Sequence, residues 1–222
     1  MKKYASCQNG RSMIEMLGVL AIVGVLSVAG IAGYSKAMEK YKLNKAIEQI
    51  VALVSGIQRA CINQSGYSGV ECNGDGDECP YLHSLGIIPS GMISRESRIL
   101  HSPWGSDISV WESSKYGEEG DYNEDEDKKA FTIYIQFNTQ GEVDKYCVPL
   151  AMYNWANIPG IIAVGGNPGD EVVKSYVGCD GKSGGDEGTS VGCLSGKTVP
   201  LPLPPKEAVA ACRAMDLALK FY

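Results

Sequence analysis

The chain has 222 residues, of which 44% are hydrophobic and 21% are charged, and its formal net charge at pH 7 is −6. This charge balance disfavours binding to nucleic acid through neutralisation of its phosphates, so nucleic-acid binding through a basic face is not predicted. The apolar excess lies at the front of the chain, and about 160 residues remain for one globular head, which we assign to residues 63–222.

The first ten residues, MKKYASCQNG, are polar and precede an apolar run of 19 residues from Met16 to Tyr34. A run of this length is about long enough to cross a ~30 Å hydrocarbon core as a helix. A secretory signal has its charged region, apolar region and cleavage site in that order, whereas here the candidate cleavage site, Gly10, precedes the apolar run. We therefore expect residues 1–10 to be a leader peptide and residues 16–34 to be a transmembrane segment.

Glu15 lies at the edge of the apolar run, where an ionised carboxylate is unfavourable unless a cation pairs with it. An ordinary signal anchor has no use for this glutamate, but a new amino terminus at Arg11 would be such a cation. Five residues, in this order, resemble the processing site of type IV prepilins: Gly10, Ser12, Met13, Ile14 and Glu15. On these residues the chain is identified as a member of the type IV pilin superfamily.

The resemblance implies that a prepilin peptidase cleaves after Gly10 and methylates the new amine of Arg11. It also implies that Glu15 pairs with the terminal amine of a neighbouring subunit while the pilus assembly machinery builds a helical filament from the inner membrane. The family usually has an apolar residue where Arg11 stands, and this guanidinium offers Glu15 a second, bidentate donor. Loss of the leader, with its two lysines, changes the formal charge from −6 to −8.

The apolar character continues beyond Tyr34 in a different pattern, because apolar residues now recur at every third or fourth position with charged residues mostly opposite. These residues are Leu43, Ala46, Ile47, Ile50, Val54 and Ile57. The pattern predicts one helix from about Ser12 to Cys61, within a segment that we assign to residues 11–62. Such a helix is roughly 75 Å long, so one half must be buried in something other than its own domain, first a membrane and later a filament core.

Small residues interrupt the apolar run and offer faces for close helix packing where no hydrophobic driving force acts between helices. They are Gly18, Gly24, Gly30 and Gly33.

Eight cysteines are many for a cytosolic chain of this size, and in an exported protein they indicate disulfides, with unpaired buried thiols as the alternative. One cysteine lies in the leader, so at least one of the other seven stays free or pairs between chains. Cys179 and Cys193 flank a glycine-rich stretch and form a natural bridge. Spacing does not select a pair among Cys61, Cys72 and Cys79, although Cys72 and Cys79 close the shortest loop.

Two further cysteine frames carry the resemblance into the head. DKYCVPLAMYNW around Cys147 and KEAVAACRAMDLAL around Cys212 resemble the two half-sites of the carboxy-terminal disulfide loop in type IVb-like pilins. The resemblance implies a bridge between Cys147 and Cys212. By the entropy of loop closure, such a bridge stabilises the folded head by on the order of 4 kcal/mol.

The head is predicted to be α+β, with an antiparallel sheet on the distal half of the long helix. Its two strongest strands are SDISVWE, through Ile108 and Trp111, and AFTIYIQF at residues 130–137. The other expected elements are a short helix near 81–92, a turn at 138–141, a helix at 148–155, strands at 161–166 and 171–179, and a helix that starts at the prolines of 204–222.

Neither catalysis nor a cofactor is predicted. The only histidines are His83 and His101, and no cysteine or histidine pair has the spacing of zinc ligands. No GxSxG motif is present, so no nucleophile has an evident base. We expect both histidines to be ordinary surface or packing residues.

An acidic loop at residues 73–77 resembles the first ligands of a calcium loop. Its sixth position is Glu78 instead of glycine, and its twelfth is Ser84 instead of glutamate. We therefore expect a solvated acidic loop here, with calcium at this loop or at Glu124 to Asp127 as the alternative.

Together these features predict a structural protein: a pilin that is inserted in the bacterial inner membrane as a precursor and then polymerised into an extracellular homo-oligomeric filament, with no sequence-specific nucleic-acid partner. Three alternatives remain. They are a pseudopilin of a type II secretion system, a minor pilin at a filament tip, and a membrane-anchored binding protein that never polymerises.

Overall fold

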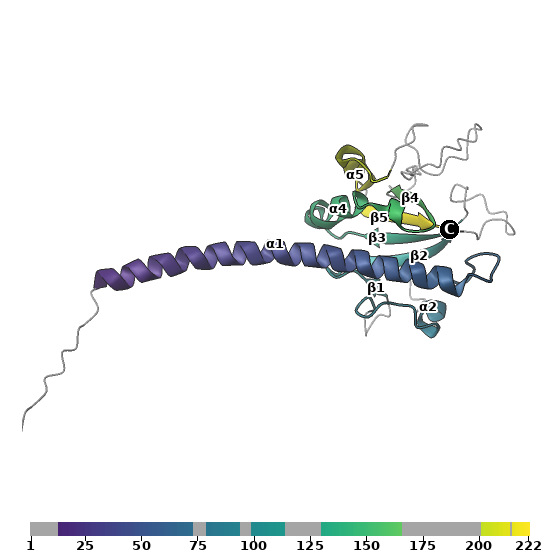
Figure 1. Ribbon diagram of the computed structural model, residues 1–222, viewed down its shortest axis with the longest axis horizontal. Coiled ribbons are helices and arrows are strands. Elements are labelled where there is room, and N and C mark those ends of the chain that lie inside the picture. Colours follow the sequence, from purple (N-terminus) through teal and green to yellow (C-terminus); the bar gives the residue numbers. More distant parts are fainter. Residues whose placement is uncertain (1–12, 73–78, 94–98, 114–129, 166–200, 214) are drawn as a thin grey trace, which may run out of the picture. The chain divides into compact units, whose positions relative to one another are not determined.

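The computed structural model describes residues 13–72, 79–93, 99–113, 130–165, 201–213 and 215–222. Within these residues the chain is α+β, with a long N-terminal helix and a five-stranded antiparallel sheet (Figure 1), so the expected fold class is confirmed. The chain divides into two compact units, Met1–Tyr41 and Lys42–Tyr222.

The long helix, α1 (Met13–Ala60), has nearly the predicted bounds and contains no proline. Its residues within the second unit present one apolar face to the head, spaced by three and four residues as the sequence indicates. The buried residues on this face are Ala46, Gln49, Ile50, Leu53, Val54, Gly56 and Ile57. The predicted amphipathic pattern is confirmed, and Leu53 extends it.

The sheet has the strand order β1-β2-β3-β5-β4, with every neighbouring pair antiparallel. Its strands are β1 (Leu100–His101), β2 (Asp107–Ser113), β3 (Ala130–Gln136), β4 (Ile161–Gly165) and β5 (Asp216–Phe221). The register places Val110 opposite Ile133 and Ile133 opposite Leu219. Since side chains alternate along a strand, this register gives the sheet one continuous apolar face.

The sheet lies against the second half of α1 (Figure 1), and its apolar face and that half of the helix form one hydrophobic core. Ile50 and Leu53 of α1 belong to the same buried cluster as Ile133 of β3 and Leu219 of β5. The sheet therefore packs on the distal half of α1, as predicted.

The C-terminal region corrects the sequence prediction, which has a helix continuing through residues 204–222. The helix α5 (Pro205–Ala211) ends after seven residues, and β5 follows it in the sheet between β3 and β4. Met215 adopts a left-handed conformation with φ 62° between the two elements. A helix would lose the pairing that β5 makes with both neighbours, so tertiary packing overrides the helical propensity of this segment.

The helical segment after β3 begins earlier than the sequence predicts. The prediction has a turn at residues 138–141 and a helix only from residue 148. Helical structure runs from α3 (Gln140–Glu142) through a π-helical turn, η1 (Val143–Cys147), into α4 (Val148–Ala151), and a 3₁₀ turn follows as η2 (Trp155–Asn157). Thr139 starts the helix, since its Oγ1 accepts a hydrogen bond of 3.2 Å from the amide of Glu142. This is half of a capping box, which fixes a helix start. The short helix predicted near 81–92 is α2 (Pro80–Ser84).

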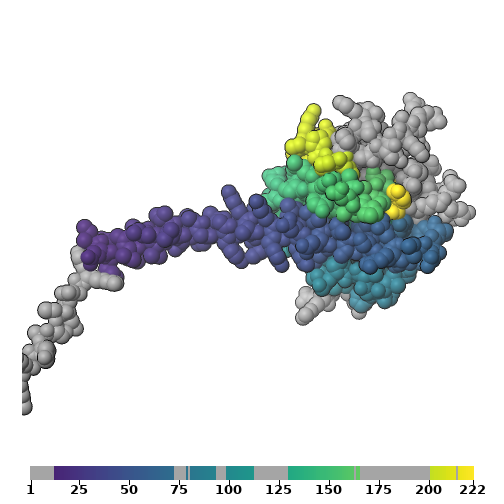
Figure 2. Space-filling model, viewed as in Figure 1, coloured from purple at the N-terminus to yellow at the C-terminus, as the bar shows by residue number. Residues whose placement is uncertain are grey.

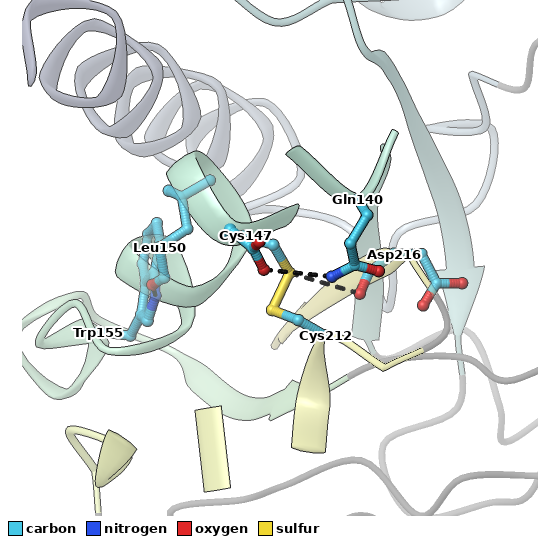
Figure 3. Close-up of a disulfide and its surroundings, with 7 residues drawn as sticks. Gln140, Cys147, Leu150, Trp155, Cys212 and Asp216 are labelled. Carbon is cyan, nitrogen blue, oxygen red and sulfur yellow. Dashed lines mark hydrogen bonds between the residues drawn. A yellow bond between two sulfur atoms is a disulfide. The ribbon is translucent and has the colours of Figure 1, made fainter. Parts of the chain in front are cut away.

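A disulfide joins Cys147, at the end of η1, to Cys212, directly after α5 (Figure 3). Their Cα atoms lie 6.0 Å apart and both residues are buried. Trp155 lies beside this region and is fully buried, and its indole N–H donates a hydrogen bond of 2.8 Å to the carbonyl of Leu150. The bridge implied by the resemblance is therefore present, and it ties the helical segment to the turn that leads into β5.

A second disulfide joins Cys72 and Cys79, with a Cα separation of 4.4 Å. Cys61 is free and buried. Cys179 and Cys193 lie outside the described residues. The choice that spacing alone left open is thus resolved in favour of the shortest loop.

The end of α1 is held to the edge of the sheet by one side chain. Gln58 Nε2 donates hydrogen bonds to the carbonyls of Pro159, at 2.9 Å, and Tyr222, at 3.1 Å. Gly160 has φ 82°, and a Cβ at this position would collide with the carbonyl of Tyr222. A glycine is therefore required for this close approach.

Several other predictions fall on residues outside the described ones. They are the leader at 1–10, the processing residues Gly10 and Arg11, the strand at 171–179, and the acidic segments at 73–77 and 124–127.

We predict that the two bridges stabilise the head unequally. The Cys147–Cys212 bridge spans 65 residues and the Cys72–Cys79 bridge spans 7. On loop-closure entropy, replacing both cysteines by serine lowers the free energy of unfolding by about 4 kcal/mol for the long loop and about 2.5 kcal/mol for the short one. Urea unfolding of the full chain in detergent, followed by tryptophan fluorescence, measures both values. A larger loss for the short loop would contradict this account.

Candidate functional site: the exposed half of α1

The part of α1 in the first unit (purple in Figure 2) carries apolar side chains on every side of the helix, and they are exposed. Twelve aliphatic or methionine side chains between Met13 and Ile31 are 48 to 87% exposed. Among the described residues, α1 is the one helix long and apolar enough to cross a membrane, and none of its most apolar 18 residues is buried within the structure. This half of α1 is compatible with a membrane anchor.

The exposed area has a large energetic consequence. Burying one such side chain contributes about 1.5–3 kcal/mol, so covering all twelve contributes on the order of 20–30 kcal/mol. The net stability of a whole domain is only about 5–15 kcal/mol. Water is therefore an unfavourable surrounding for this helix, and the described residues of the chain do not cover it.

Two polar side chains, Glu15 and Ser27, interrupt the apolar stretch between Met13 and Ile31. Ser27 Oγ donates a hydrogen bond of 2.7 Å to the carbonyl of Val23, four residues earlier, so its hydroxyl needs no water. Glu15 lies in the first turn of α1, where the helix dipole favours a negative charge. Of the residues expected to act in processing and assembly, Glu15 alone lies within the described residues.

The glycines of α1 separate into two kinds. A Cβ added at Gly56 would lie 2.9 Å from Cβ of Ile87, so the head needs a glycine there. A Cβ added at any glycine of the apolar half would meet nothing within 4 Å; these are Gly18, Gly24, Gly30 and Gly33. Each of them costs a helix in water about 1 kcal/mol relative to alanine, and the described residues make no close contact there that offsets this cost. Their small faces remain available to another helix.

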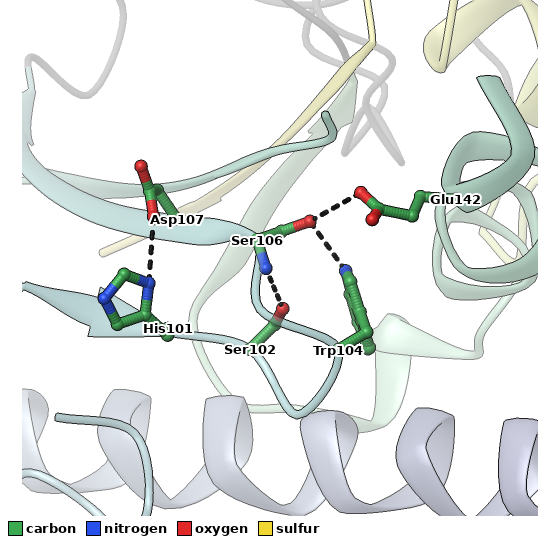
Figure 4. A network of polar contacts seen from close by, with 6 residues as sticks. All are labelled: His101, Ser102, Trp104, Ser106, Asp107 and Glu142. Atoms are coloured by element: carbon green, nitrogen blue, oxygen red, sulfur yellow. Dashed lines mark hydrogen bonds and ion pairs between the residues drawn. The ribbon is translucent and has the colours of Figure 1, made fainter. Parts of the chain in front are cut away.

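The polar groups of the head form a structural network (Figure 4). Ser106 Oγ accepts a hydrogen bond of 2.8 Å from the Trp104 indole N–H and donates one of 3.2 Å to Glu142 Oε2. Trp104 in turn stacks on Tyr146, with ring centroids 4.2 Å apart. Ser106 is fully buried, so its hydroxyl is not open to a substrate. The network holds the loop between β1 and β2 against α3 and η1.

The sequence does not predict this network as a whole. The spacing Thr139-x-x-Glu142 is a capping-box signal and could have identified Glu142 as a helix-start residue. Glu142 also accepts a hydrogen bond of 2.9 Å from the amide of Asn138. Nothing in the spacing of Ser106 indicates its contact with Glu142, which is 36 residues away.

The network contacts described above involve neither histidine. His101 is half-buried, with Nδ1 2.9 Å from Asp107 Oδ1 on the neighbouring strand. His83 is exposed in α2. Among the residues that the structure describes, no group of three or more histidine, cysteine or acidic residues could hold a metal ion.

Cys61 is buried at the end of the core, and its burial raises the pKa of the thiol. Burial also raises the pKa of Tyr67, with a smaller contribution from Cys61. A thiol that is protonated and buried is a poor nucleophile. Cys61 is therefore a packing residue in this head.

No protein-family model matches the chain, and no curated protein matches it either. Its function is therefore argued from its own residues and geometry. These define a class: an α+β head on a long helix whose first half is apolar on all sides.

We predict that Gly24→Ala and Gly56→Ala have different effects on the head. Alanine at position 56 overpacks the contact with Ile87 and lowers the free energy of unfolding by about 1–3 kcal/mol. Alanine at position 24 points into open space, so it does not lower that value and raises it by at most about 1 kcal/mol through helix propensity. Urea unfolding in detergent compares the two variants. If Gly24→Ala destabilised the head as much as Gly56→Ala, the division of glycines made here would be wrong.

Proposed function

We propose that this chain is a subunit of a type IV pilin-like filament. It is held in the inner membrane as a precursor, cleaved after Gly10, and polymerised with the apolar half of α1 in the filament core and the heads outside. The observation that carries this proposal is the set of twelve exposed apolar side chains on a helix whose other half packs in the head. A bilayer covers these side chains before assembly, and other copies of α1 cover them afterwards.

Glu15 gives such an assembly its register. Among packed apolar helices, a carboxylate without a cation costs several kcal/mol, so it favours the position where a neighbouring subunit's terminal amine meets it. A shift by one helical turn moves the carboxylate about 5.4 Å and breaks this pair. The pair therefore selects one axial offset from the many that apolar side chains alone would permit.

The head has properties that suit exposure outside the cell. The described residues contain two disulfides, and disulfides persist in oxidising compartments. After cleavage the formal charge of −8 favours solubility of the heads. These features support an extracellular location for the head.

The main competing function is that of a membrane-anchored binding protein, because a bilayer alone would also cover the apolar half of α1. Such a protein would keep Met1 to Gly10 and would not need Glu15. A secretion pseudopilin would yield no long surface fibres, and a minor tip pilin would be present in fibres only at trace stoichiometry.

Glu15→Ala separates assembly from anchoring. We predict that this variant resists carbonate extraction from membranes like the wild type, because the apolar run is unchanged. Its filaments in the sheared surface fraction fall at least about 100-fold, because each subunit loses a buried ion pair worth about 3–5 kcal/mol when one partner is removed.

The matched control is Glu207→Ala, which removes a carboxylate from α5 of the head. This variant is expected to form filaments at the wild-type level. Normal filaments from Glu15→Ala would refute the role assigned to this carboxylate.

A further inference from the structure

The segment of α1 from Tyr34, the last residue of the apolar run, to Tyr41 combines two tyrosines and two lysines. Tyr34 and Tyr41 are 67% and 63% exposed. Lys36 and Lys40, which lie between them, are exposed as well. All four belong to the first unit of the chain, next to the apolar run and ahead of the head.

Helical geometry sorts these four residues onto two faces. Tyr34 and Tyr41 are seven residues apart and share one face, whereas Lys36 and Lys40 are four apart and share a face roughly opposite. From Tyr34 to Tyr41 the helix rises about 10 Å. The polar headgroup layer on one side of a bilayer is about 5–8 Å thick, so this segment has the length needed to cross it.

We propose that residues 34–41 are an interfacial anchor that binds anionic phospholipid headgroups. The two tyrosine rings lie at headgroup level, where their apolar bodies and polar hydroxyls are both satisfied. The two lysines lay their methylene chains along the helix and extend their ammonium groups to lipid phosphates. This proposal rests on the membrane anchor of the proposed function, but it does not require polymerisation.

Charge near the anchor supports an anionic partner. Residues 34–41 contain two lysines and one acidic residue, Glu39, so their formal charge is +1, although the whole chain is negative. Lysines next to a membrane span normally mark its cytoplasmic side. The proposed function, which the disulfides support, places the head on the oxidising side instead, so topology does not account for these lysines. Contact with anionic headgroups accounts for them.

The test uses the full chain reconstituted in vesicles of equal parts phosphatidylcholine and phosphatidylglycerol. Native mass spectrometry after transfer into a mild detergent measures the ratio of phosphatidylglycerol to phosphatidylcholine that stays bound. The wild type is expected to retain phosphatidylglycerol preferentially, and Lys36→Gln with Lys40→Gln is expected to lower this preference about 10-fold or more. The preference also falls as salt is raised, because salt screens exposed charges.

The matched control is Lys206→Gln with Arg213→Gln, which removes two exposed basic side chains from the head. It is expected to keep the wild-type lipid preference. An unchanged preference in the Lys36 and Lys40 variant, or an equal fall in the control, would overturn the proposal.

Two further outcomes distinguish this proposal from a protein–protein interface and from the membrane anchor on which it rests. Chemical crosslinking in the same vesicles reports oligomers. If the Lys36 and Lys40 variant lost these oligomers but kept the lipid preference, the lysines would face a second copy of the chain and the lipid proposal would be wrong. If the wild type failed to float with vesicles of phosphatidylcholine alone, the membrane anchor itself would be wrong. A chain that floats but shows no lipid preference overturns this inference and leaves the anchor intact.

Discussion

The helix α1 has to satisfy two different surroundings with one continuous backbone. Over its first half apolar side chains point in every direction, and over its second half they line one face that completes the core of the head. Because the first half gains on the order of 20–30 kcal/mol from an apolar environment, this division dictates where the chain can be stable. Glu15 is the exception to the apolar rule, and a charge in such a place has to be answered by a specific cation.

The last strand in the chain, β5, completes the sheet of the head. β5 pairs with β3 and β4, and the turn ahead of it is tied by the Cys147–Cys212 bridge. Gln58 of α1 bonds to the carbonyl of Tyr222, directly after β5. These covalent and long-range ties favour the closed head over partly opened forms.

Sequence predicted the features that arise from periodicity and missed those that arise from long-range pairing. The helix α1 and the strands β2 and β3 follow from their spacing of apolar residues. β5 was missed because its residues are buried on both faces, so alternation is weak, and because Met215 makes the turn that a glycine usually signals. The helix start at Gln140 was missed although the capping-box spacing marks it. Glu15 follows from its charge at the edge of the apolar run and from the resemblance to prepilins, and its role in assembly stays a prediction. The contrast between Gly24 and Gly56 needed the position of Ile87.

The central claim is that this chain is processed and incorporated into a filament outside the cell. The most direct measurement is the intact, non-reduced mass of the protein in the surface fraction sheared from its native cells. The account predicts an abundant fibre fraction whose mass lacks Met1 to Gly10, is raised by one methyl group, and is lowered by two hydrogens for each disulfide. A full-length mass confined to membranes would contradict it and would favour an anchored binding protein.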